Sequence, residues 1–390
     1  MRRGQKLSID LPAPVRQIIH TLEAAGHEAY AVGGCVRDSV LGRIPDDWDI
    51  TSSACPREIK ALFSHTIDTG IQHGTVTVML DHIGYELTTY RVDRGYLDGR
   101  HPRAVRYTPS LTEDLKRRDF TINALMKDTQ TGKILDFFGG MKDLESGIIR
   151  HCTEKFAEDS LRVFRAAQFA SRFGFEIAPE TIEIAKTLDC TALPMERILE
   201  ETKKAITKSE TPSVFFKELK KMGVLDLFFP PLKLELIDKL TKASKELHSE
   251  KVTEIVIAVI FESSKLTITN QTEIVEMIKS FKFLSEATSS FIKDSKTVGE
   301  LVFLTEQIKF KEFALFSILV EGVKLGLPTF EIKLLTSMFK ASQETISTQF
   351  ITGQELIQLG FKPSKEFGEL ILQSKKLACQ GKSKKEFIKS

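Results

Sequence analysis

Two aspartates separated by one residue, in the sequence Asp47-Trp48-Asp49, are the side chains best suited to chemistry in this chain. The segment 47–51 predicts a strand, on which side chains two residues apart point to the same face. Both carboxylates could therefore share divalent cations. Two Mg²⁺ ions held there would activate a hydroxyl and stabilise the departing pyrophosphate of a nucleotide. An Asp-x-Asp pair also occurs in many surface turns, so its surroundings must decide between the two interpretations.

A glycine pair precedes these aspartates by about a dozen residues. The apolar run Ala29–Val32 predicts a buried strand that ends in Gly33-Gly34, and residues 35–41 predict a short helix. Glycine lets the backbone approach a phosphate closely, and a helix N-terminus offers unpaired N–H groups. Arg37, on the first turn of that helix, can reach the same anion. Such a turn can serve packing alone, but next to an acidic pair it predicts a phosphate cradle that includes Gly34 and Arg37.

A longer set of motifs surrounds these residues. The stretch GGCVRDSVLGRIPDDWDITSSACP resembles the opening motif of the class II tRNA nucleotidyltransferase and bacterial poly(A) polymerase family. The resemblance continues in order through HGTVTV, ELTTYR, LKRRDFTINAL, DFFGG, FAEDSLRVFRA and MERILEE, and it covers roughly residues 28–205. It implies template-independent addition of C, C and A to the 3′ end of tRNA from CTP and ATP. Two Mg²⁺ ions are the implied cofactors.

The resemblance also implies an α+β fold in four parts. A polymerase-β-like head with a mixed sheet is expected at 1–150, a helical neck that recognises the base at 151–210, a helical body at 211–325, and a helical, tRNA-binding tail at 326–390. The residues agree with this division. Residues 74–80 and 85–90 predict a β-hairpin, 94–109 a long loop, and 121–126 a helix, whereas amphipathic helical periodicity dominates after about Phe156.

By this resemblance Asp47 and Asp49 are catalytic metal ligands. Glu86, on the neighbouring strand, is either a third catalytic carboxylate or a solvent-facing strand residue. In the motif Lys116-Arg117-Arg118-Asp119, Arg118 is expected to contact the nucleotide phosphates and Asp119 to accept a hydrogen bond from a ribose hydroxyl.

Asp159 and Arg162 carry the prediction for base choice. Placed three residues apart on a helix, they share one face and could form a simple intrahelical ion pair. Alternatively, a carboxylate and a guanidinium complement the amino donor and ring-nitrogen acceptor that cytosine and adenine share, and so reject uracil and guanine. Arg165, one turn later, is expected to meet the triphosphate. The family commonly has a further arginine where this chain has Gln168.

Related functions remain open at this stage. Residues 69–78 lack the basic run of bacterial poly(A) polymerases, and residues 93–102 resemble the loop associated with switching from C to A, with Asp98 and Arg100 inside it. Full CCA addition is therefore favoured over CC-only addition, while an A-adding enzyme keeps the same loop. A non-enzymatic RNA-binding protein on the same head is the alternative from another class, and the intact aspartates argue against it.

The overall composition is that of an ordinary globular protein. The chain has 42% hydrophobic and 28% charged residues and a formal net charge of +2, so a nucleic-acid partner must be argued from local features. Five scattered cysteines favour neither disulfides nor a structural zinc site. We expect no membrane segment and a cytoplasmic location. The expected partners are the tRNA 3′ end, CTP and ATP, and the sequence specifies no protein partner.

Shortening the segment 94–102 tests the role of the loop. We expect addition of C to persist and addition of the final A to fail, because the loop resembles the element associated with that switch. Products formed on tRNA lacking CCA, resolved at single-nucleotide length, measure this. Equal loss of both additions would mean that the loop has only a structural role.

Overall fold

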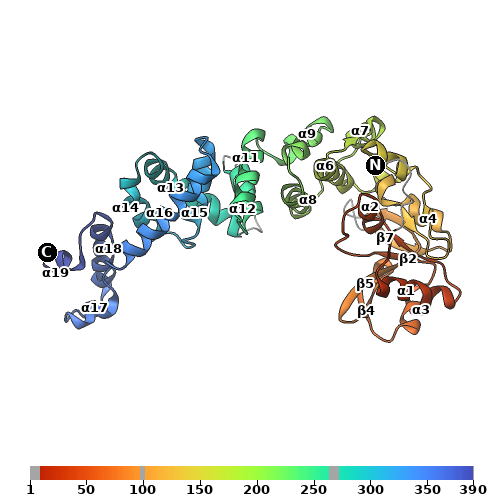
Figure 1. The fold of residues 1–390 in the computed structure, drawn as a ribbon, viewed down its shortest axis with the longest axis horizontal. Coiled ribbons are helices and arrows are strands. Elements are labelled where there is room, and N and C mark those ends of the chain that lie inside the picture. The colour runs from red at the N-terminus through yellow and green to blue at the C-terminus, as the bar shows by residue number, and fades with distance from the viewer. Residues whose placement is uncertain (1–8, 97–101, 263–271, 390) are drawn as a thin grey trace. The chain divides into compact units, whose positions relative to one another are not determined.

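The computed structural model describes residues 9–96, 102–262 and 272–389 (Figure 1). The chain divides into two compact units. Unit 1 comprises Met1–Ala205 with Val214–Leu227, and unit 2 comprises Ile206–Ser213 with Phe228–Ser390. The finer division into head, neck, body and tail stays a prediction.

Unit 1 contains a seven-stranded mixed sheet in the order β3-β4-β5-β2-β1-β8-β9. Only the pair β2 and β5 is parallel; the other described pairs in this sheet are antiparallel. The strands are β1 (Ala29–Val32), β2 (Ile50–Ser52), β3 (Thr66–Gly70), β4 (Thr75–Leu80), β5 (Ile83–Thr89), β8 (Met126–Lys127) and β9 (Ile134–Leu135). The expected α+β class is confirmed.

Helix α1 (Ala13–Ala24) covers the middle of this sheet. Its buried side chains are spaced three or four residues apart and form one apolar face: Val15, Ile18, Ile19 and Leu22. That face packs on β1 and β2. Strand β1 ends where α2 (Gly34–Val40) begins, so burial of the sheet centre also fixes the start of the glycine turn.

The predicted hairpin is confirmed. Strands β4 and β5 pair antiparallel through a tight turn in which Asp81 and His82 both have positive φ, 50° and 64°. These angles match a type I′ turn, whose twist suits two-residue hairpins. Along β5, Tyr85 and Leu87 are buried, whereas Glu86 between them is exposed on the other face.

Three local predictions were wrong in part. Strand β2 begins at Ile50, so Asp47 and Asp49 precede it in non-regular backbone. The predicted loop 94–109 contains paired strands, β6 (Arg91–Tyr96) and β7 (Pro102–Tyr107), because main-chain pairing needs no alternation of apolar side chains. Asp98 and Arg100 lie outside the described residues.

The third correction concerns the segment 121–126. A single 3₁₀ turn, η2 (Thr121–Asn123), replaces the predicted helix, and β8 follows it directly. Met126 pairs with Val32 as part of the sheet, and its extended backbone prevents a helix from continuing to this residue. Helix α5 (Gly140–Ser146) packs against η2.

Short helices complete unit 1 and lead into unit 2. They are η1 (Ile71–His73), α3 (Pro56–Leu62), α4 (Leu111–Lys116), η3 (Glu154–Glu158), α6 (Leu161–Phe173), α7 (Pro179–Lys186), α8 (Met195–Lys208), α9 (Ser213–Lys221) and α10 (Leu225–Phe228). Two short parallel strands, β10 (Ile148–Ile149) and β11 (Glu176–Ile177), join the sequence after α5 to that after α6. The described part after Phe156 is thus helical apart from β11, as the periodicity predicts.

Unit 2 is helical throughout its described residues. Its elements are α11 (Leu234–Glu246), α12 (Val252–Phe261), α13 (Thr272–Lys293), η4 (Ser295–Thr297), α14 (Val298–Thr305), α15 (Phe313–Lys324), α16 (Thr329–Ser347), α17 (Gly353–Gln358), α18 (Lys365–Cys379) and α19 (Lys384–Lys389). Phe291 and Phe339 meet in its core, with ring centroids 6.3 Å apart. Across the described ranges, the helices are too short or too polar to cross a membrane.

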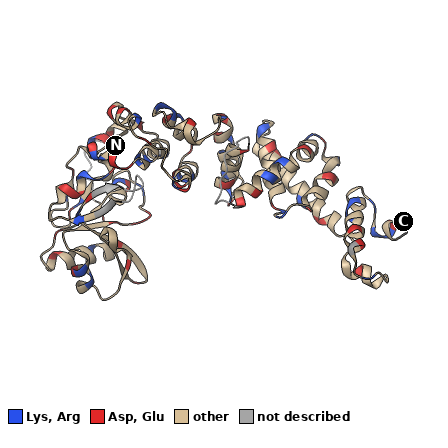
Figure 2. Ribbon diagram, turned by 180° about the vertical axis from the view of Figure 1, so that it is seen from behind, with Lys and Arg blue, Asp and Glu red and all other residues tan. Residues whose placement is uncertain are grey.

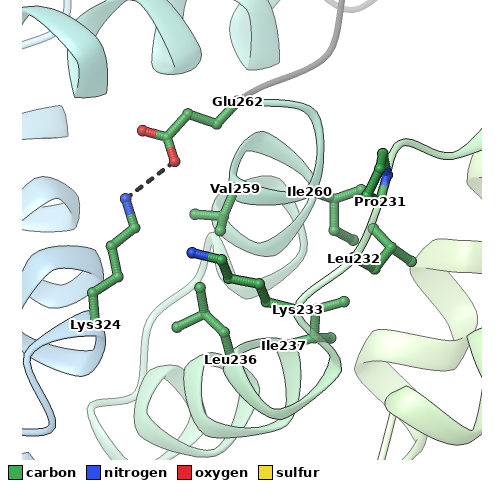
Figure 3. Close-up of a pocket in the computed structure, with 9 residues that line it drawn as sticks. All are labelled: Pro231, Leu232, Lys233, Leu236, Ile237, Val259, Ile260, Glu262 and Lys324. Carbon is green, nitrogen blue, oxygen red and sulfur yellow. Dashed lines mark hydrogen bonds and ion pairs between the residues drawn. The ribbon is translucent and has the colours of Figure 1, made fainter.

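A cavity of about 330 Å³ lies in unit 2 between α11, α12 and the end of α15 (Figure 3). Its walls are mainly apolar, and Lys324 and Glu262, whose Nζ and Oε2 atoms are 3.1 Å apart, form an ion pair at its edge. None of the residues predicted for the site lines it. Figure 2 shows acidic and basic residues mixed over both units, in keeping with the small net charge.

A substitution at Gly140 tests how tightly α5 must approach η2. A Cβ atom at Gly140 would lie 2.3 Å from the carbonyl oxygen of Thr121, a contact that backbone movement must relieve. We expect Gly140→Ala to lower the free energy of unfolding of unit 1 by about 1–3 kcal/mol. Denaturant unfolding of the full chain measures it.

Gly368 on α18 is the matched control. A Cβ atom there meets nothing within 4 Å, so Gly368→Ala should be neutral or stabilise by up to about 1 kcal/mol through helix propensity. Equal effects of the two substitutions would contradict the tight approach of α5.

Candidate active site

Three carboxylates gather at one end of the parallel strand pair. Asp47 and Asp49 lie just before β2, and Glu86 lies on β5. Because Ile50 pairs with Leu87 in parallel register, the residues immediately before them, Asp49 and Glu86, lie next to each other. Asp47 and Glu86 are exposed and Asp49 is half-buried. The structure therefore brings the predicted carboxylates together.

The electrostatics of this group suit a cation. Burial and the negative charge of Asp47 raise the pKa of Asp49 to about 6, and Glu86 adds to the rise. The Arg118 guanidinium opposes it but does not cancel it. A half-buried carboxylate beside two like charges is short of nearby positive charge, and bound divalent cations would supply it.

The donor set fits Mg²⁺ in particular. Among the described residues, no three His, Cys, Asp or Glu side chains are placed to hold one ion together. Mg²⁺ does not need such a cage, since it keeps several waters and binds through one or two carboxylates together with substrate phosphates. Asp47 and Asp49 offer that pair at an exposed edge.

The glycine turn lies close to this edge. Gly33 has φ 83° and ψ −130°, a conformation open to glycine alone, and its N–H donates to the carbonyl of Leu125. A Cβ atom at Gly33 would lie 3.6 Å from Nη1 of Arg118. Gly34 starts α2. The turn, Arg118 and Asp49 thus form one neighbourhood, in which Arg118 can face a phosphate.

Arg37 borders the glycine turn but is already bound by other side chains: its Nη2 lies 3.6 Å from the place that a Cβ atom at Gly34 would take. It is only 3% exposed, its Nε donates to Asp38 at 2.8 Å, and its Nη1 donates to Oδ1 of Asn123. Its guanidinium carbon lies 5.1 Å and 4.8 Å from the ring centroids of Phe169 and Phe173 on α6. In this structure Arg37 joins α2 to α6, and its contact with a phosphate stays a prediction.

Asp119 and Arg165 are bound to each other. Oδ2 of Asp119 accepts hydrogen bonds from Nε and Nη2 of Arg165 at 2.9 Å and 2.6 Å. Burial by itself would raise the pKa of Asp119, but Arg165 and the amide of Asn123 more than offset it, so this pKa lies below its usual range. The pair leaves Nη1 of Arg165 outside these two bonds, and the Arg165 side chain is 33% exposed.

Asp159 and Arg162 are close, although not on one helix. Asp159 precedes α6, and its Oδ1 accepts from the N–H of Leu161 at 3.0 Å. Its Oδ2 lies 3.8 Å from Nε of Arg162, whose other nitrogens donate to the carbonyls of Lys155 and Arg117 at 2.6 Å. Burial raises the pKa of Asp159 although Arg162 lowers it. The prediction that the two residues share one face of a helix was wrong, but they do form an ion pair. Their recognition of the base stays a prediction.

The sequence alone did not indicate two buried side chains that bind the predicted site residues. Asp114 is fully buried and accepts from Arg117 at 2.6 Å and from Arg118 at 3.3 Å. Its spacing of three and four residues before these arginines could have indicated it. Asn123 donates to Asp119 at 3.0 Å and accepts from Arg37, 86 residues earlier, and no local spacing announces that contact.

Comparison with known proteins assigns the family. Residues 29–150 match the model of the poly A polymerase head domain, and residues 174–236 match the model described as a probable RNA and SrmB-binding site of polymerase A. A CCA-adding enzyme of Levilactobacillus brevis is 35% identical over 91% of this chain and 90% of its own length. The chain belongs to the CCA-adding enzymes, a family of tRNA nucleotidyltransferases. The resemblance predicted from the motifs is confirmed.

Other CCA-adding enzymes locate the similarity. The enzyme of Lactiplantibacillus plantarum is 53% identical over 169 residues, 43% of this chain and 41% of that enzyme. The crystal structure of the Bacillus stearothermophilus CCA-adding enzyme in complex with CTP is 26% identical, with a TM-score of 0.70 over 95% of this chain and 94% of that one. A Thermotoga maritima CCA-adding enzyme complexed with tRNA is 19% identical with a TM-score of 0.71 over 98% and 96%, and it shares the fold.

Replacement of Asp49 tests the electrostatics of the acidic group. Because the pKa of Asp49 is raised from 3.8 to about 6, the folded state binds more protons than the unfolded state between these values, and stability falls as pH rises through that window. In divalent-free buffer we expect Asp49→Asn to stabilise the protein at pH 7–8 by on the order of 1–2 kcal/mol, and the gain to vanish near pH 4.

Urea unfolding with a chelator at pH 4, 6 and 8 measures this gain. Asp47→Asn is the control, since the exposed Asp47 loses only its share of the repulsion and should give a smaller gain. An Asp49→Asn variant no more stable than the wild type at pH 8 would contradict the charge imbalance.

Proposed function

We propose that this chain adds C, C and A to the 3′ end of tRNA from CTP and ATP by two-metal nucleotidyl transfer, releasing pyrophosphate. The observation that carries the proposal is the group of Asp47 and Asp49, just before β2, and Glu86, on β5, with Arg118 and the Gly33 turn beside it. The similar enzymes described above in complex with CTP and with tRNA support these substrates. The proposed setting is the cytoplasm.

The acidic group would hold two Mg²⁺ ions. Bound there, the ions would lower the pKa of the attacking 3′-hydroxyl and neutralise charge on the departing pyrophosphate. Asp47 and Asp49 supply their carboxylate ligands, and Glu86 adds negative charge at the same edge. Arg118, held by Asp114 through a 3.3 Å contact, faces the phosphates and stays charged throughout.

The nucleotide would lie between this edge and α6. Asp119 accepts a ribose hydroxyl and Arg165 meets the triphosphate, so their mutual ion pair is exchanged for contacts with the nucleotide. Asp159 and Arg162 then read the base. One oxygen of Asp159 accepts from the N–H of Leu161, and the other, ion-paired with Nε of Arg162 at 3.8 Å, is the one that would accept from an exocyclic amino group.

Loss of the metal ligands tests the reaction itself. We expect Asp47→Ala and Asp49→Ala each to reduce nucleotide addition by at least about a thousandfold while tRNA still binds, because both activation and charge stabilisation disappear. In the assay, tRNA that ends at the discriminator base is incubated with CTP alone, with ATP alone or with both. The products are read at nucleotide resolution.

Asp68→Ala is the matched control. Asp68 is an exposed aspartate of β3 paired with Lys60 at 2.9 Å, away from the acidic group, and its loss should change addition little. Near-normal nucleotide addition by both Asp47→Ala and Asp49→Ala would show that the proposal is wrong. Addition of A alone by the wild type would assign the A-adding alternative.

Asp159 tests base choice. We expect Asp159→Ala to weaken discrimination against UTP and GTP and to slow addition of C and A by on the order of 1.5–3 kcal/mol, the value of a charge-assisted hydrogen bond. Arg162→Ala should impair C and A alike. Single-nucleotide kinetics with all four nucleotides measure both, and an unchanged preference for CTP and ATP in both variants would leave the pair a structural ion pair.

A further inference from the structure

Five side chains form a closed ring of contacts where α2, η2 and α6 meet. Arg37 donates to Asn123, Asn123 donates to Asp119, and Asp119 accepts from Arg165. Phe169 closes the ring, since the guanidinium carbons of Arg37 and Arg165 lie 5.1 Å and 5.3 Å from its centroid. Arg165 and Asp119 are the proposed nucleotide contacts and Arg37 is a predicted phosphate contact, whereas Asn123 and Phe169 have no assigned role.

Asn123 is the polar centre of this ring. It is 7% exposed, and its amide oxygen faces a guanidinium while its amide nitrogen faces a carboxylate. Only this orientation satisfies both neighbours, because the guanidinium can only donate and the ionised carboxylate can only accept. An aspartate at this position could satisfy Arg37 but would oppose Asp119, and an aliphatic residue would satisfy neither.

On the side of Phe169, this ring of contacts packs against further aromatic side chains. The ring of Phe169 is stacked on that of Phe173 at 5.8 Å with an interplanar angle of 11°, and it meets Phe120 edge-on at 5.6 Å. Arg37 is 3% exposed and packs on two of these rings, so solvent does not replace Asn123 as its partner if Asn123 is changed. Oδ1 of Asp119 accepts from the N–H of Phe120 at 2.8 Å and from the amide of Asn123 at 3.0 Å, while Oδ2 faces Arg165. Among the described residues, Asn123 is the side-chain donor that fixes Oδ1.

We propose that Asn123 is a positioning residue for nucleotide binding. Its amide fixes the carboxylate of Asp119, and through it the guanidinium of Arg165, in the orientation from which they exchange their ion pair for a ribose hydroxyl and a triphosphate. This inference rests on the proposed function, and it adds a residue whose polarity, rather than its size, is required.

The charges around Asp119 determine what a carboxylate at position 123 would do. Arg165 and Arg162 on α6 stabilise the charged form of Asp119, and Asp159 and Cys152 also lie within electrostatic reach. From α2, Arg37 is already paired with Asp38. Two carboxylates in contact cannot both ionise easily, so one of them takes up a proton at a higher pH than an ordinary aspartate. The protonated group then donates to its neighbour, as the amide does.

The experiment compares Asn123→Asp with Asn123→Leu. For each, the KM for CTP and the equilibrium affinity for CTP are measured at pH 6 and pH 8 and divided by the wild-type values. For Asn123→Asp we expect about a tenfold weakening at pH 8 that largely recovers at pH 6. For Asn123→Leu we expect the same weakening at both pH values. A purely structural role would not produce a recovery limited to the aspartate variant.

Thr121→Val is the matched control. Thr121 belongs to the same 3₁₀ turn and is buried, but its hydroxyl donates to Asp143 at 2.7 Å, outside the ring. Loss of this hydroxyl should lower the melting temperature. The affinity for CTP, relative to that of the wild type, should be the same at pH 6 and pH 8.

A reversed pair covers the case in which Asn123→Asp folds poorly. Asp119→Asn combined with Asn123→Asp restores an amide–carboxylate contact, so its melting temperature should exceed that of Asn123→Asp while its affinity for CTP stays low, since Arg165 has lost its carboxylate. If the wild type adds C and A but neither variant at position 123 changes CTP binding, the inference is wrong. If the wild type adds no nucleotide, the proposed function fails instead.

Discussion

Burial of the Arg37 guanidinium is the constraint on which the arrangement of unit 1 depends. A permanently charged group that is 3% exposed needs full compensation, because an unpaired buried charge is strongly destabilising. Asp38, the amide of Asn123 and the faces of two phenylalanines supply it. Those partners come from three different elements, so satisfying one side chain brings α2, η2 and α6 together.

This junction places two groups of opposite charge side by side. On one side, Asp47, Asp49 and Glu86 crowd so that the pKa of Asp49 rises to about 6. On the other, arginines from the segment after α4 and from α6 are held by Asp114 and Asp119. The proposed ligands, divalent cations and a nucleoside triphosphate, are complementary in charge to these two groups. Without cations, repulsion among the three carboxylates would lower the free energy of unfolding of the protein above the pKa of Asp49.

Internal pairing is the other feature of the site. Asp119 binds Arg165, and Arg162 binds two backbone carbonyls. Such pairing keeps buried charges satisfied when no substrate is bound. In the proposed reaction, contacts with the nucleotide would replace some of these protein contacts, so changes in the surrounding amide and aromatic side chains would alter affinity without touching the substrate.

The sequence by itself determined the elements whose signals are local. The apolar run Ala29–Val32, the hairpin of β4 and β5 and the periodic helices follow from side-chain pattern, and the acidic pair and its motifs carried the family and the reaction class. Tertiary structure alone decided where β2 begins, that β6 and β7 pair, and that Asp159 lies outside α6. It also decided that Arg37, beside the glycine turn, is bound by Asn123, 86 residues away. These outcomes depend on partners distant in the chain, and a buried charge takes whichever partner folding brings to it, which no local spacing encodes.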